Sequence, residues 1–81
     1  MKQRILALLH NKTVAELDLA KADLDNLLDS SVGVAEHISL TQTAEEGVVK
    51  ITQLSDQLTM LRKLLAEIQK DTEETNRDDD G

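Results

Sequence analysis

The sequence predicts an all-α protein folded as an antiparallel two-helix hairpin, and three observations lead to this fold class. Turn-forming residues are scarce, because the 81 residues include no Pro and only three Gly. Strong helix formers dominate the apolar set, which contains fourteen Leu and seven Ala but no aromatic residue. Apolar residues also recur at spacings of three and four, as on the packed face of a helix. The regular turn signals that a β-sandwich needs are missing.

The clearest helical pattern lies in the second half of the chain. Apolar residues there recur without interruption at spacings of 3-4-3-4-3: Ile51, Leu54, Leu58, Leu61, Leu65 and Ile68. This coiled-coil-like seam continues backward through Leu40 and the small residues Ala44 and Gly47. We therefore expect a helix over residues 34–72. A capping-box pattern at Thr43 and Glu46 offers a competing start, so residues 31–46 are either continuous helix or a loop before a helix that starts near Thr43.

The first half of the chain admits two interpretations. Thr13 and Glu16 fit a capping box that would start a helix at residue 14. That helix would place four apolar residues on one face: Val14, Leu17, Leu24 and Leu28. Alternatively, a single helix covers residues 2–29 and keeps one seam throughout: Leu6, His10, Thr13, Leu17, Ala20, Leu24 and Leu27. The unbroken 3-4 spacing of the second set favours the continuous helix.

A polar break separates the two expected helices, and an acidic segment follows the second. The break falls at residues 29–33, where serines can cap a helix and Gly33 relieves the backbone. After Asp71 the chain has no further apolar residue, and residues 71–81 carry six acids against one Arg. Such composition is typical of solvated, disordered chain. We expect one hairpin domain over residues 1–72 and a disordered acidic tail over residues 73–81.

A hairpin of this size is expected to associate with a second copy. Small chains without disulfides, metals or aromatic side chains bury little core of their own. We expect two hairpins to pair into a four-helix bundle through one apolar set: Ile51, Leu54, Leu58, Leu61, Leu65, Ile68, Leu17, Leu24 and Leu28. Charge favours antiparallel pairing, because the loop end is acidic and the open end carries six bases: Lys2, Arg4, Lys12, Arg62, Lys63 and Lys70.

Composition argues against several classes of function and location. The chain contains no Cys, which rules out disulfides, thiol nucleophiles and zinc–cysteine sites and makes the cytoplasm the default location. A net charge of -7 and the absence of aromatic residues argue against nucleic acid as a partner. No stretch approaches the roughly 18 apolar residues of a membrane span. The apolar run at residues 5–9 is too short for an export signal.

No pattern of residues indicates catalysis, a cofactor or a bound metal. Neither His10 nor His37 has a second ligand three or four residues away, so we interpret both as seam residues. The serines lack a glycine-rich elbow and a neighbouring base. Glu45 and Glu46 are adjacent, so their carboxylates diverge around a helix and do not form an acid–base pair.

The function expected from these features is non-catalytic. We expect a protein–protein interaction module, such as a small adaptor, an assembly factor or a chaperone-like subunit, acting through its Leu/Ile seam. The alternative is an acidic regulatory protein that binds a basic surface of a transcription or other macromolecular machine. The net charge of -7 permits this alternative without selecting it.

Overall fold

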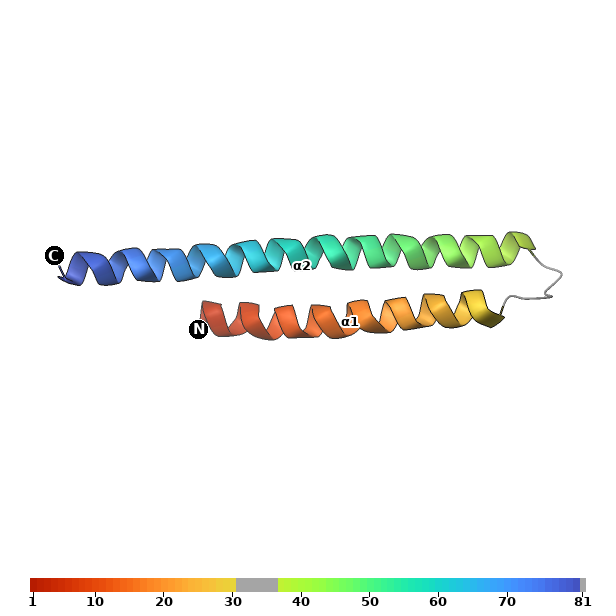
Figure 1. The fold of residues 1–81 in the computed structure, drawn as a ribbon, viewed down its shortest axis with the longest axis horizontal. Helices are drawn as coiled ribbons and strands as arrows, with labels where there is room; N and C mark the ends of the chain where they lie inside the picture. The colour runs from red at the N-terminus through yellow and green to blue at the C-terminus, as the bar shows by residue number, and fades with distance from the viewer. Residues whose placement is uncertain (31–36, 81) are drawn as a thin grey trace.

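The computed structural model describes two long helices packed against each other as an antiparallel hairpin (Figure 1). It describes residues 1–30 and 37–80, with the side chains of residues 1–29 and 39–70. Helix α1 covers Lys2–Ser30 and helix α2 covers His37–Asp80. The all-α fold class and the hairpin are therefore confirmed. The expected start of the second helix at residue 34, like the break at residues 31–33, lies outside the described residues.

Contacts between the helices fix their register. The Gln57 amide donates a hydrogen bond to Thr13, and the Arg62 guanidinium donates one to His10. Gly47 lies against Leu24. In these three pairs the residue numbers add to between 70 and 72, as a constant antiparallel register requires. Extended along the helices, this register places Lys70 opposite Met1.

The layer between the helices follows the 3-4 spacing on both sides. Its centre consists of Leu17 and Ala20 from α1 with Leu54 and Leu58 from α2, and Leu61 is also buried. The remaining α1 positions of the continuous seam are half-buried or buried: Leu6, His10, Thr13, Leu24 and Leu27. This burial agrees with the interpretation of residues 2–29 as one helix, since all seven seam positions face α2.

The two capping boxes of the sequence do not start helices. Thr13 lies in the middle of α1, is 1% exposed, and donates its hydroxyl hydrogen to the Leu9 carbonyl at 2.8 Å. Thr43 lies inside α2 and donates to the Ser39 carbonyl at 3.0 Å. Threonine in a helix can bond the carbonyl four residues back in this way, so a Thr-x-x-Glu pattern alone does not mark a helix start. Helix α2 begins at His37 instead.

Helix α2 extends beyond the end of its partner helix. It has 44 residues against 29 in α1, and residues 71–80 continue it past Met1 with no part of α1 alongside (Figure 1). Residues 73–80 belong to α2, which continues to Asp80, and the expectation that residues 73–81 are disordered stays a prediction. Residues 71–80 contain neither Pro nor Gly, so no residue in this segment interrupts the helical hydrogen bonds.

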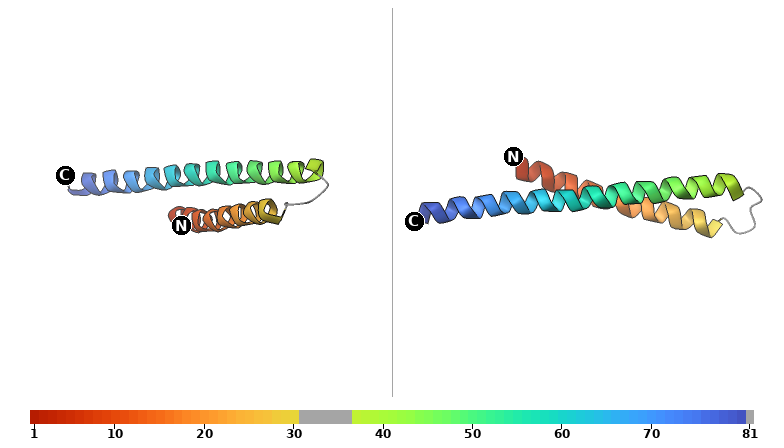
Figure 2. Two further views of the ribbon diagram at one scale, coloured as in Figure 1. Left: turned by 45° about the vertical axis from the view of Figure 1, so that its right-hand side comes forward. Right: turned by 90° about the horizontal axis from the view of Figure 1, so that it is seen from above.

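The resulting molecule is a thin rod. Its extents are 70 × 16 × 15 Å and its radius of gyration is 19.4 Å, against about 12 Å for a compact domain of this length. The two helices cross at a shallow angle, which is visible when the hairpin is viewed from above (Figure 2). In such a rod every side chain outside the central layer borders solvent.

Candidate interaction surface

Most of the side chains that the sequence predicted to contact a partner lie between α1 and α2. Among them, four are buried: Leu17, Leu54, Leu58 and Leu61. Another four are half-buried: Leu24, Ile51, Leu65 and Ile68. Leu28 is 50% exposed and does not belong to the layer between the helices. The seam thus packs mainly α1 against α2, and a second protein has to contact other side chains first.

Large apolar side chains are exposed along the rod. They are Met1, Ile5, Leu8, Leu9, Leu19, Leu28, Val48, Val49, Met60 and Leu64. Apart from Leu28, sequence periodicity does not single them out, because the other nine fall outside the 3-4 pattern of the seam. An apolar residue outside that pattern, on a thin rod, is the signal that could have identified them.

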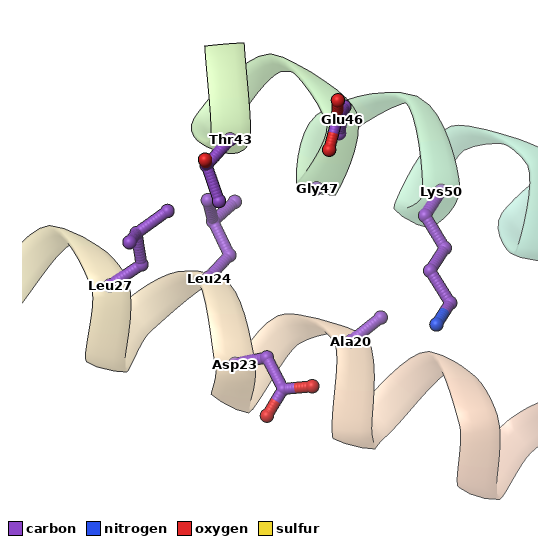
Figure 3. A pocket seen from close by; sticks show the side chains of 8 residues that line it. All are labelled: Ala20, Asp23, Leu24, Leu27, Thr43, Glu46, Gly47 and Lys50. Carbon is purple, nitrogen blue, oxygen red and sulfur yellow. The ribbon is translucent and has the colours of Figure 1, made fainter. Parts of the chain in front are cut away.

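A hollow opens on one side of the hairpin near its loop end. Its volume is about 310 Å³, and its lining combines α1 residues Ala20, Asp23, Leu24 and Leu27 with α2 residues Thr43, Glu46, Gly47 and Lys50. Figure 3 shows these side chains around a gap between the two helices, with Gly47 facing Leu24. We call the side of the hairpin onto which this hollow opens the front face.

Gly47 is one of the residues that line this hollow. A Cβ atom placed there would lie 3.3 Å from Leu24 Cδ1, so the helices approach closely at this point. The lining of the hollow is largely apolar, with Asp23 and Glu46 among its polar residues.

The front face carries an apolar patch nearer the open end, which we define as Ile5, Leu9, Met60 and Leu64. In helices that keep a heptad register, residues fourteen apart share a side. Leu9 therefore lies on the same side as Asp23, and Met60 on the same side as Glu46. All four patch side chains are exposed, with Met60 at 53%. Their i,i+4 spacing within each helix makes them neighbours.

Charge alternates along the rod in three zones. The open half, residues 1–13 and 57–70, carries six basic side chains and the single acid Glu67. The loop half, residues 14–29 and 39–56, carries eight acids and two lysines. Residues 71–80 of α2 carry six acids and one arginine. The apolar patch thus lies in the basic zone and the hollow in an acidic zone.

Polar contacts between the helices lie near the middle of the rod. Thr13 accepts a hydrogen bond from Gln57 at 3.2 Å, and His10 Nε2 accepts one from Arg62 at 3.4 Å. Lys12 pairs with Glu16 at 3.8 Å on the surface of α1. The two contacts between the helices agree with one antiparallel register, whereas the Lys12–Glu16 pair lies within α1.

The described part of the chain presents no group of three metal-ligating side chains. No helix within the described ranges has the length and apolar character needed to cross a membrane. The side chain of His37 lies outside the described residues, so the interpretation of that histidine as a seam residue stays a prediction. Comparison with known proteins finds no matching family model, no matching curated protein and no matching solved structure.

Proposed function

We propose that this protein is a non-catalytic protein–protein interaction module, of the kind that serves as a small adaptor, assembly factor or chaperone-like subunit. The observation that supports the proposal best is the exposed apolar surface. Five apolar side chains are buried among the described residues, whereas ten large ones are exposed. Four of the ten form the apolar patch of the front face, and such a patch on a small protein is typical of an interaction site.

The total surface of the chain supports the same proposal. The rod exposes 6538 Å², whereas a compact protein of 9.0 kDa exposes about 4,900 Å². The difference exceeds the roughly 800 Å² that each partner buries in a standard protein interface. Association is therefore the direct way for this chain to remove its excess surface from water.

We further propose that the hairpin acts as a homo-oligomer, with two hairpins forming a four-helix bundle. The 3-4 spacing of the buried residues in both helices is the pattern of coiled-coil packing, which extends readily from two helices to four. Because the seam is used within the hairpin, the pairing surface consists of the side chains that flank it. The absence of Cys supports a cytoplasmic location for this assembly.

Affinity capture with a matched variant tests the proposed function. The immobilised protein should retain a stoichiometric partner, or a second copy of itself, through a wash in 0.5 M salt, since apolar contacts resist screening. The double variant Met60→Asp/Val48→Asp places charge on both sides of the rod and should lose that retention. Equal retention of the partner by the wild-type protein and the double variant would refute an interaction module that acts through apolar contacts. So would a chain that captures nothing and stays monomeric at millimolar concentration.

The charge zones favour a second candidate function, an acidic regulatory protein that occupies a basic surface of a macromolecular machine. The loop half offers eight acids against two lysines to such a target. Binding of this kind should weaken steeply between 0.05 and 0.5 M salt and should tolerate Met60→Asp, because long-range attraction between exposed charges is screened. The two functions therefore give opposite results in the same capture experiment.

A further inference from the structure

We propose that two copies of this chain pair antiparallel through their front faces, with the apolar patch of each copy seated over the hollow of the other. This proposal deepens the proposed function and rests on it, because it assigns both the surface and the partner. The patch and the hollow lie on the same face of one molecule. A twofold axis between two copies can therefore place the patch of each copy over the hollow of the other, so that the same contact forms twice.

The axis follows from where the two features lie along α2. The hollow is centred near Gly47 and the patch between Met60 and Leu64. The midpoint is at the level of Ser55, and hollow and patch are separated by about 23 Å at 1.5 Å per residue. A twofold axis at that level, perpendicular to the rods, lays α1 on α1 of the second copy and α2 on α2. Every neighbouring pair of helices is then antiparallel.

This symmetry brings protruding side chains of one copy to the hollow of the other. On α2 the facing residue numbers add to about 110, which places Leu64 over Glu46 and the gap at Gly47. On α1 they add to about 32, which places Leu9 beside Asp23. The hollow has a largely apolar lining and a volume of about 310 Å³, larger than a leucine side chain. The exposed Leu64 is the side chain that best fills it.

Charge complementarity selects a second copy in this orientation. The pairing sets the basic open half of each copy, with six bases and one acid, against the acidic loop half of the other, with eight acids and two lysines. Lys63 approaches Glu46, and Lys12 approaches Asp23. A parallel pairing through the same face would set six bases against six bases, which is unfavourable.

Sedimentation equilibrium of matched variants tests which face is used. The wild-type chain should sediment at twice 9.0 kDa at micromolar to millimolar concentration. Met60→Asp should raise the dimer dissociation constant at least about 100-fold, because the contact occurs twice per dimer. Val48→Asp is the control, since Val48 is equally exposed at 52% but flanks the seam on the opposite side. Circular dichroism establishes that both variants remain helical.

A charge swap tests the register between copies. Lys63→Glu and Glu46→Lys should each weaken the dimer, and the variant carrying both substitutions should recover most of the wild-type affinity. The two residues are seventeen apart on one helix, about 25 Å, so they cannot compensate each other within a chain. A double variant weaker than either single variant would overturn the assigned contact.

Spin-label distances test the antiparallel arrangement. Single labels at Glu45, Asp56 and Ala66 should give axial separations of about 30, 3 and 33 Å between copies, because distance grows by about 3 Å per residue away from the axis. These labels lie off the front face. Equal separations at all three sites would show parallel pairing and overturn the proposal.

The outcomes separate this proposal from the proposed function. A wild-type chain that stays at 9.0 kDa but captures another protein through its apolar surface overturns the dimer and leaves the interaction module intact. A dimer disrupted by Val48→Asp and not by Met60→Asp overturns the choice of face alone. A monomeric chain that captures nothing refutes both.

Discussion

Single polar residues inside the seam determine how the two helices align. Thr13 is 1% exposed, and its hydroxyl both donates to the Leu9 carbonyl and accepts from Gln57. No buried polar side-chain atom in the described part of the chain lacks a partner. A buried hydrogen bond between helices contributes little net stability, but it penalises registers in which it is broken. Thr13 therefore selects the register more than it stabilises the fold.

Replacing Thr13 by Val tests this role. Val keeps the β-branched shape, Gln57 remains hydrated, and the Leu9 carbonyl keeps its helical partner, so no buried group is left unpaired. Thr13→Val should leave the free energy of unfolding unchanged or raise it by up to about 1 kcal/mol. Thr13→Ala, which also opens a cavity, should lower it by about 1–2 kcal/mol. Urea denaturation measures both, and a Thr13→Val loss as large as that of Thr13→Ala would contradict the argument.

Gly47 offers a second test at the residue scale. Alanine is favoured over glycine inside a helix by up to about 1 kcal/mol, and its Cβ would meet only the movable tip of Leu24 at 3.3 Å. Leu24 can turn into the adjacent hollow. Gly47→Ala should therefore raise the melting temperature of the hairpin under conditions where it is monomeric. A lower melting temperature would show that Leu24 has no room to move.

At the scale of the helices, the faces that pack α1 against α2 could be predicted from the periodicity of apolar residues. The 3-4 spacing from Ile51 to Ile68 identified one packed face, and the matching spacing from Leu6 to Leu27 identified the other. The bounds of α1 were predicted to within one residue, since a helix over residues 2–29 was favoured and Lys2–Ser30 is observed. The capping sequences at Thr13 and Thr43 did not locate helix starts, because both threonines bond carbonyls four residues back. The apolar patch could not be predicted either, since its exposure depends on which side of each helix the partner helix covers.

The extension of α2 beyond α1 should contribute little to the stability of the hairpin. Residues 71–80 have no part of α1 alongside, and their six acids lie at a helix C-terminus, where the helix dipole disfavours negative charge. The free energy of unfolding of a chain ending at Lys70 should differ by less than about 0.5 kcal/mol from that of the full chain. Thermal denaturation of the monomeric proteins measures the difference. A loss of several kcal/mol would show that these residues contact the hairpin.

A leucine buried between the helices should, in contrast, contribute strongly to the stability of the hairpin. Leu61 is 4% exposed in the layer between the helices. Leu61→Ala should lower the free energy of unfolding by about 2–4 kcal/mol, because the lost contacts leave a cavity. Met60→Ala, on the exposed neighbouring position, should cost less than about 0.5 kcal/mol in the monomer. Equal losses at both positions would contradict the assignment of inner and outer faces.

At the scale of the whole molecule, the thin rod explains why the sequence alone could not identify the surface that contacts a partner. The sequence predicted that a partner contacts Leu17, Leu54 and Leu58, because two helices rarely bury both of their apolar faces completely. In the structure they form the centre of the hairpin. Leu58→Asp would therefore unfold the chain and report nothing about a partner, whereas Met60→Asp changes the surface of a hairpin that still folds.

The alternation of charge along the rod has a consequence for chromatography. Although the chain has a net charge of -7, its open half is a band of six bases about 20 Å long that a negatively charged resin can contact alone. The monomer should therefore be retarded on a cation exchanger at pH 7 and low salt, as well as bound by an anion exchanger. Antiparallel pairing would cover that band with acids, so retention on the cation exchanger should fall as the protein concentration rises.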